Sequence, residues 1–205
     1  TSQGLRILAA GTHNITCITS SNQNFTQSLD STSYLINKAT PICNLQILPS
    51  QIIVYGTPVN VTASCNTNQV NQNTYRNNIL VNNELGINKI LGVNTYTYAA
   101  NSSNTQNFTD SSTNTYLVTV AQALNPTMLL LNNIQGNITI LTTQTLNATA
   151  SSASSNFQML RDSIDVTSQS GLNINLATGL YKYEVFSNGN ENYTSNLTGI
   201  SFYVN

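Results

Sequence analysis

An internal repeat constrains this chain more than any other feature of its sequence. One segment begins at a glycine, ends in Asn, an aromatic residue and Thr, and occurs three times: at residues 11–26, 92–109 and 179–194. Its asparagines, Asn24, Asn107 and Asn192, are spaced by 83 and 85 residues. A repeat of this length indicates modules in series. We therefore expect two complete units and, in front of them, the back part of another: 40–122, 123–205 and 1–39.

Apolar and polar residues alternate within each unit. Val59, Val61 and Ala63 alternate with Asn60 and Thr62. A period of two is typical of a β-strand with one buried face, and turn residues separate such segments. No amphipathic run has a helical period with a cap. Roughly seven short strands in a unit of this length predict an all-β protein of tandem immunoglobulin-like β-sandwiches.

The strands of the second unit are expected in the immunoglobulin order: A at 44–48, B at 58–65, C at 73–77, E at 87–91, F at 93–100 and G at 113–121. The third unit follows with F at 179–187 and G at 196–204. By this alignment residues 1–39 contain only strands E, F and G. Such a piece has an apolar face with nothing to cover it and is not a stable sandwich alone. We expect upstream sequence or another chain to complete it, as in strand complementation.

A three-part motif runs through the repeat. It reads Gly-x-Tyr-x-Tyr-x-Cys, then Gln-Asn-Tyr/Phe-Thr, then Leu-x-Val-Asn-Lys-Ala-Thr-Pro, and this chain has its versions at 11–17, 23–26 and 35–41. The motif resembles the Ig-like repeats of large archaeal cell-surface proteins. This resemblance covers nearly the whole chain and implies an extracellular or cell-surface location. In that family a Cys on strand B pairs with a Cys on strand F, and this chain departs from the pattern because Ala100 stands at the F position.

The three cysteines are placed unevenly. If strands A and B form an antiparallel pair around a turn at residue 54, Cys43 lies opposite Cys65, within bridging range. We therefore expect a Cys43–Cys65 disulfide, which implies an oxidising compartment; two free buried thiols are the alternative. Cys17 stands at the F position of the partial unit. It is either free, or bonded to another chain or to upstream sequence.

Asn-x-Ser/Thr triplets, the acceptors of N-glycosylation, are abundant. The candidates are Asn14, Asn24, Asn60, Asn101, Asn107, Asn137, Asn147, Asn192 and Asn196. Three of them recur at the turn between strands F and G, which we call the F–G turn. Asn also stabilises turns and accepts positive φ, so a purely structural role is the alternative. Glycans would supply the solubility that few charges do not.

The composition excludes several classes of function. Charged residues are 6% of the chain and the net charge is -1, against about 25% charged residues in ordinary domains. The basic residues are spread singly, so we expect no nucleic-acid binding. The longest apolar run is residues 128–131, too short for a membrane span. No signal peptide opens the sequence at Thr1, which predicts a mature or trimmed product.

No residue set predicts catalysis, a metal site or a cofactor. His13 is the single histidine and replaces the first Tyr of the F-strand motif, which indicates a packing position rather than a partner of Asp30 in a triad. Asp162 and Asp165 provide too few ligands for calcium. We expect no enzyme.

A structural role fits these observations best. The first hypothesis is a cell-surface or filament subunit, pilus-like, assembled from copies of itself or with upstream sequence through completion of the partial unit. A stalk or glycan-binding module of a surface adhesin is the alternative, and a virion surface protein is a weaker one. The partner of residues 1–39 distinguishes the filament from the stalk: strands supplied by a neighbouring chain favour the filament hypothesis.

Overall fold

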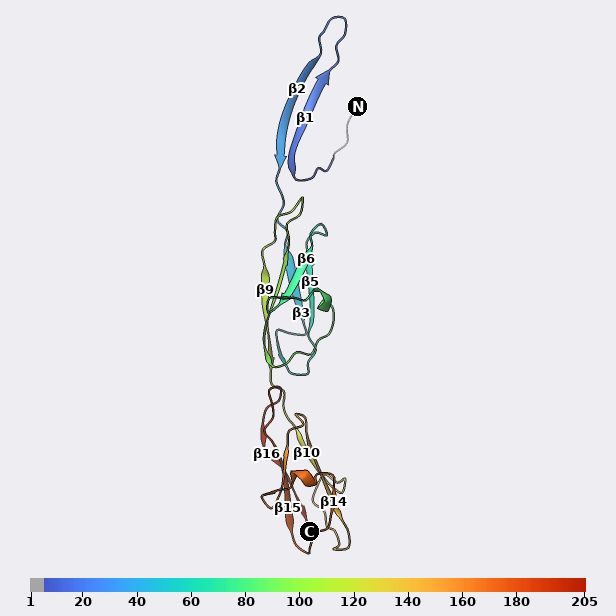
Figure 1. Ribbon diagram of the computed structural model, residues 1–205, viewed down its shortest axis with the longest axis vertical. Helices are drawn as coiled ribbons and strands as arrows, with labels where there is room; N and C mark the ends of the chain where they lie inside the picture. The colour runs from blue at the N-terminus through green and yellow to red at the C-terminus, as the bar shows by residue number, and fades with distance from the viewer. Residues whose placement is uncertain (1–5) are drawn as a thin grey trace. The chain divides into compact units, whose positions relative to one another are not determined.

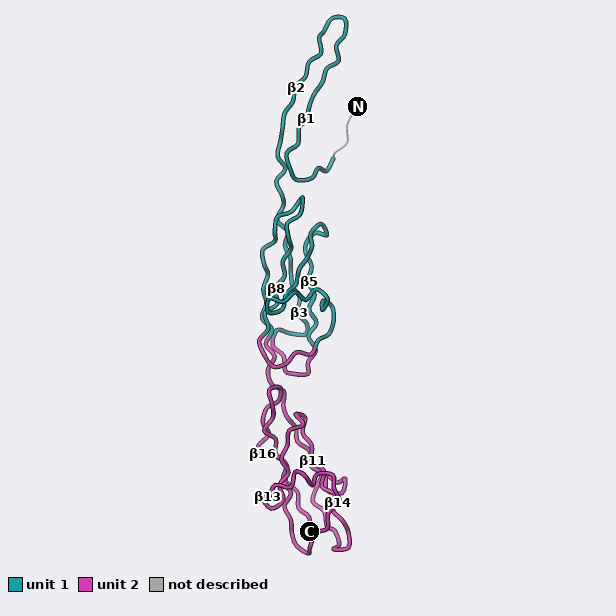
Figure 2. Tube along the Cα trace, viewed as in Figure 1, with its two compact units in different colours: residues 1–51, 59–89, 96–118 teal, residues 52–58, 90–95, 119–205 magenta. Residues whose placement is uncertain are grey.

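The computed structural model describes residues 6–205, and every regular element in that range is a β-strand or a single turn of 3-10 helix. The all-β class is therefore confirmed. By its contacts the chain divides into two compact units, residues 1–51, 59–89 and 96–118 and residues 52–58, 90–95 and 119–205 (Figure 2). The repeat boundaries after residues 39 and 122 stay a prediction.

The amino-terminal hairpin consists of β1 (Gly11–Thr19) and β2 (Ser28–Ile36) (Figure 1). The strands pair antiparallel from Gly11↔Ile36 to Thr19↔Ser28. They are the expected strands F and G. The expected strand E, at residues 4–8, is not formed over its described part, 6–8, and residues 4 and 5 lie outside the described residues. Strand E needs the ladder of a strand B, which this segment does not contain.

The first sandwich follows the hairpin. One sheet pairs β3 (Cys43–Leu48) with β5 (Asn60–Cys65). The other has the order β4 (Ile52–Val54), β9 (Asn114–Ala121), β8 (Asn94–Ser102), β6 (Gln72–Arg76) and β7 (Ile79–Leu80), and a 3-10 turn follows at Asn82–Glu84. Side chains of both sheets are buried, among them Leu45, Val61 and Tyr98. This burial is what the alternating pattern predicts.

Two expectations for this sandwich need correction. The residues expected as a plain turn around 54 include β4, which pairs parallel with β9 because Ile53 finds a buried site there. The expected strand E at 87–91 is reduced to one bridge, Val59↔Lys89. The Asn60 side chain takes the place of the ladder, since its Nδ2 donates to the carbonyl oxygen of Gly86 (2.9 Å) and to Oδ1 of Asn88 (3.0 Å).

The carboxyl-terminal sandwich repeats this plan. One sheet contains β10 (Thr127–Leu131), β11 (Leu146–Ser152) and β14 (Asn173–Ile174). The other contains β13 (Ile164–Asp165), β12 (Gln158–Arg161), β15 (Tyr181–Ser187) and β16 (Asn196–Val204), with a 3-10 turn at Thr167–Gln169. Leu129 and Leu146 from one sheet and Met159 and Tyr183 from the other are fully buried in one cluster. Two sheets around one core define the immunoglobulin-like sandwich.

Backbone turns repeat as faithfully as strands. The turn between β6 and β7 places Asn77 and Asn78 at φ 49° and 66°, and the turn between β12 and β13 places Asp162 and Ser163 at φ 51° and 69°. Two consecutive positive φ values define the hairpin turn that matches strand twist, and Asn and Asp tolerate it best. These polar pairs therefore fix both hairpins in the same way.

Candidate assembly surface on the amino-terminal hairpin

The register of the hairpin decides which side chains share a face. Directly opposite residues of an antiparallel pair point to the same side of the sheet. One face therefore holds the pairs His13↔Tyr34, Ile15↔Thr32 and Cys17↔Asp30. The opposite face holds the pairs Thr12↔Leu35 and Ile18↔Leu29.

The first of these faces corresponds to the core face of the complete sandwich. In the repeat alignment, Ile15 and Cys17 stand where Tyr183 and Val185 stand in β15. Tyr183 and Val185 are 0% exposed, whereas Ile15 is 56% exposed. Within the described residues, the surface that a complete module buries is open to solvent in the hairpin.

His13 has the role of a structural aromatic residue. Its Nε2 lies 2.8 Å from the carbonyl oxygen of Ala9, and its ring stacks on Tyr34 with 5.5 Å between centroids. Its counterpart Tyr181 makes the same contact, because its hydroxyl donates to the carbonyl oxygen of Ala177 at 3.1 Å. Both side chains reach back four residues to the backbone. His13 therefore replaces the tyrosine in binding the chain before strand F.

The cysteines differ in state. Cys43 and Cys65 form a disulfide and are directly opposite each other in the β3–β5 ladder, the register that the sequence predicts. Cys17 is a free, exposed thiol on the open face of the hairpin. The disulfide is consistent with an extracellular protein.

The candidate glycosylation residues fall into two groups. Asn14, Asn24 and Asn137 are exposed, and the other candidates are half-buried. The amides of Asn60 and Asn147 are occupied in the same manner, since each Nδ2 donates to a glycine carbonyl oxygen at 2.9 Å. These two side chains therefore hold neighbouring backbone segments in place. The Asn-x-Ser/Thr triplet alone does not reveal this role.

Four of the remaining candidates also have structural contacts through their side chains. The Oδ1 atoms of Asn107 and Asn192 each accept a distant backbone N–H, and Oδ1 of Asn137 accepts from the N–H of Tyr203. Nδ2 of Asn196 donates to the carbonyl oxygen of Asn125 at 3.2 Å. Asn101 is half-buried on β8. The recurrence of Asn at the F–G turn therefore has a structural reason.

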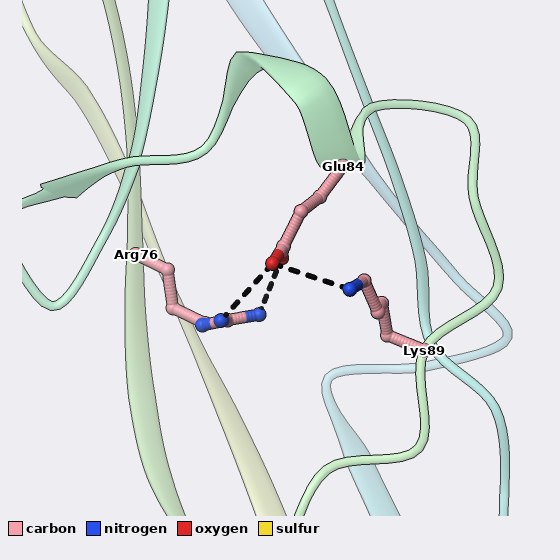
Figure 3. A network of polar contacts seen from close by, with 3 residues as sticks. All are labelled: Arg76, Glu84 and Lys89. Carbon is pink, nitrogen blue, oxygen red and sulfur yellow. Dashed lines mark hydrogen bonds and ion pairs between the residues drawn. The ribbon is translucent and has the colours of Figure 1, made fainter.

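A charged cluster in the first sandwich is a brace between its elements (Figure 3). Glu84 lies between Arg76 and Lys89, with N···O distances of 2.5 Å and 3.4 Å. Partial burial alone would lower the pKa of Arg76, but the Tyr98 hydroxyl and the Glu84 carboxylate together raise it above its ordinary value. The three charged groups therefore pair with one another within the first sandwich.

The two aspartates considered for calcium also serve the backbone. Oδ1 of Asp162 accepts from the N–H of Lys182 at 2.8 Å, and Oδ1 of Asp165 accepts from the N–H of Thr167 at 2.9 Å. Among residues 6–205 no group of three His, Cys, Asp or Glu side chains is arranged to hold a metal ion. In the same range no helix is long and apolar enough to cross a membrane.

Comparison with known proteins leaves the family open. No family model matches the sequence, and no curated protein matches it. Among solved structures, the fibronectin(III)-like modules of Clostridium thermocellum CbhA match with 12% identity over 78% of this chain and 93% of that chain, at a TM-score of 0.28. A likeness this distant carries no argument about function. By their own topology these are immunoglobulin-like β-sandwich modules, a type common in extracellular surface proteins.

Proposed function

We propose that this protein is a structural subunit of an extracellular or cell-surface assembly, without a catalytic role, and that another polypeptide segment completes the amino-terminal hairpin. The open core face around Ile15 carries this proposal. Covering one such side chain contributes about 1.5–3 kcal/mol. A segment that covers this face and pairs with the hairpin would also cover the Tyr34 ring, and its polar groups would pair with Asp30 on the same face.

The hairpin also has an open edge for pairing. In the complete modules the counterpart of β1 bonds on one side to the G strand and on the other to the C strand, as β15 bonds to β16 and β12. Within the described residues β1 pairs with β2 alone. An incoming strand that pairs antiparallel with β1 would satisfy this edge, which is β-augmentation.

The proposed partner is a copy of this protein or upstream sequence of a longer chain, and the proposed assembly is filamentous and pilus-like. The resemblance to archaeal cell-surface repeats supports the setting, and glycans on exposed asparagines would keep the weakly charged surface soluble. Negative-stain electron microscopy of the native material tests the proposal. Regular fibres are the expected result, and dispersed monomers at high concentration would contradict it.

Substitution on the two faces of β1 sharpens this test. Ile15→Asp adds a second carboxylate to the open core face, which already holds Asp30. It should abolish fibres, because the apolar contribution of Ile15 is lost and the added charge would be buried on completion. Thr16→Asp is the matched control, since Thr16 is the adjacent, exposed residue on the opposite face. Fibres that survive Ile15→Asp would show that this face is not the assembly surface.

A further inference from the structure

The F–G turn makes one set of contacts that occurs twice in the chain. In the unit that contains the hairpin, the N–H of Ala39 donates to the carbonyl oxygen of Asn107 at 3.0 Å, and the N–H of Thr109 donates to the carbonyl oxygen of Ala39 at 2.9 Å. Oδ1 of Asn107 accepts from the N–H of Ala10 at 2.9 Å. The turn thus binds Ala10, which precedes the hairpin in the chain, and Ala39, which follows it.

The second set has the same bonds at equivalent residues. The N–H of Ala123 donates to the carbonyl oxygen of Asn192 at 3.0 Å, and the N–H of Thr194 donates to the carbonyl oxygen of Ala123 at 2.9 Å. Oδ1 of Asn192 accepts from the N–H of Val93 at 3.0 Å. All these residues lie within the other compact unit. An arrangement repeated atom for atom defines a docking mode of the F–G turn.

In the unit that contains residues 119–205, a pair of aromatic rings completes the docking mode. Tyr193 follows Asn192 and meets Tyr55 edge-on, with 5.3 Å between ring centroids. The position of Tyr55 is fixed by its N–H, which donates to the carbonyl oxygen of Ala121 at 2.8 Å. Edge-to-face rings contribute beyond their buried area.

The hairpin presents a third F–G turn that is already in the docking conformation. The N–H of Asn22 donates to the carbonyl oxygen of Phe25, and its Oδ1 accepts from the N–H groups of Asn24 and Phe25. Asn190 makes the same bonds within the docked turn. Yet Phe25, the counterpart of Tyr193, is 72% exposed, and Asn24 is exposed with no side-chain bond among residues 6–205.

The carboxyl-terminal sandwich carries the surface that this turn would fit. Thr178 is the counterpart of Val93, because each stands three residues before the first Tyr of the repeated segment. Ile140 is the counterpart of Tyr55, since its N–H donates to the carbonyl oxygen of Asn205 as that of Tyr55 does to Ala121. Together they line a pocket with Leu141, Tyr181 and Val204.

We propose that the F–G turn of the hairpin docks into this pocket on a second copy of the chain. Oδ1 of Asn24 accepts the N–H of Thr178, as Oδ1 of Asn107 accepts that of Ala10 and Oδ1 of Asn192 accepts that of Val93. The Phe25 ring packs on Ile140 and Leu141, as the Tyr193 ring packs on Tyr55. The side chains of residues 20–27 and of the pocket residues are all uncharged, so the contact buries no charged side chain. The docking uses surfaces distinct from the open face around Ile15, and it therefore goes beyond completion of the hairpin.

A cross-link formed between two different variants tests this contact. One protein carries Cys17→Ser and Phe25→Cys, and the other carries Cys17→Ser and Leu141→Cys. The matched control replaces Leu141→Cys by Leu172→Cys, at a leucine outside the pocket that is 56% exposed, against 67% for Leu141. After mild oxidation, we expect several-fold more heterodimer from the pocket pair, measured by non-reducing electrophoresis and mass spectrometry. Equal yields from the two pairs would overturn the proposal.

Sedimentation velocity on the otherwise unchanged chain provides a second measurement. Phe25→Ala should weaken self-association about tenfold or more, because a buried ring is lost. Phe25→Tyr should preserve it, since Tyr stands at the equivalent position 193. Association of the alanine variant at the unchanged strength would refute the docking.

A third arm separates this contact from completion of the hairpin. Ile15→Asp, added to the cross-linking pair, should leave the heterodimer yield unchanged even where fibres are lost. Loss of the cross-link together with the fibres would show that the turn does not dock by itself, which contradicts the proposal.

Discussion

The Cys43–Cys65 disulfide should stabilise the first sandwich selectively. It closes a loop with a sequence separation of 22 residues, and the chain-entropy estimate for such a loop is about 3 kcal/mol. The variant Cys43→Ser/Cys65→Ser, made together with Cys17→Ser, should lose about this much free energy of unfolding. The carboxyl-terminal sandwich has no cysteine and therefore serves as an internal control within the same molecule.

Hydrogen exchange in graded urea, read by mass spectrometry, measures both sandwiches at once. Peptides from β5 report on the first sandwich and peptides from β11 on the other. Global urea curves would mix the two transitions, so a resolved probe is needed. The exchange of β5 should shift to lower urea when the disulfide is removed, while that of β11 stays unchanged. An unchanged β5 transition would refute the loop-closure argument, and an equal shift in both would show that the sandwiches do not unfold separately.

Three further predictions follow from the described contacts. Glu84→Gln should cost the first sandwich about 1–2 kcal/mol. Gln169→Glu should stabilise the carboxyl-terminal sandwich, because a carboxylate at this equivalent position, where a buried Oε1 has no partner, would pair with Arg161, the counterpart of Arg76 in the repeat. Calorimetry that shows no change for either variant would contradict the stabilising role of this ion pair. Burial raises the pKa of Tyr183 above its ordinary value of 10.0, so stability is full below that pH and falls as pH rises through the folded-state pKa; alkaline melting that spares the carboxyl-terminal sandwich would contradict this. Mass spectrometry of glycopeptides from the native host should find Asn24 occupied and Asn60 bare, because the amide nitrogen of Asn60 is bonded to backbone; the reverse pattern would overturn the distinction.

The sequence predicts strands wherever apolar residues alternate and the turns are polar. The register that places Cys43 opposite Cys65 follows from antiparallel pairing around a turn, so the sequence alone predicts it. The strand β4 was not, because three apolar residues beside a turn do not reveal which sheet they join. The loss of strand E was also hidden, since it depends on the Asn60 side chain bonding across the sheet.

The candidate assembly surface on the hairpin is partly predictable from the sequence. A repeat alignment shows that the hairpin lacks partner strands, and it places Ile15 and Cys17 at core positions of the complete module. The docking contacts of the F–G turn were not predictable, because Asn107 and Ala10 are 97 residues apart in sequence. At this turn the sequence shows only a recurring asparagine, which N-glycosylation and a structural role in the turn explain equally well.

The parallel pairing of β4 with β9 has a mechanical consequence. Strand β4 lies near the entry of the chain into its sandwich and β9 lies at the exit, and the two run in the same direction. Tension along the polypeptide would pull them past each other, so that their hydrogen bonds break together rather than one by one. The bridge between Ile138 and Val204 repeats this geometry in the other sandwich. In both sandwiches tension would load these parallel pairs in shear, and the force at which they rupture would depend on the unfolding rate.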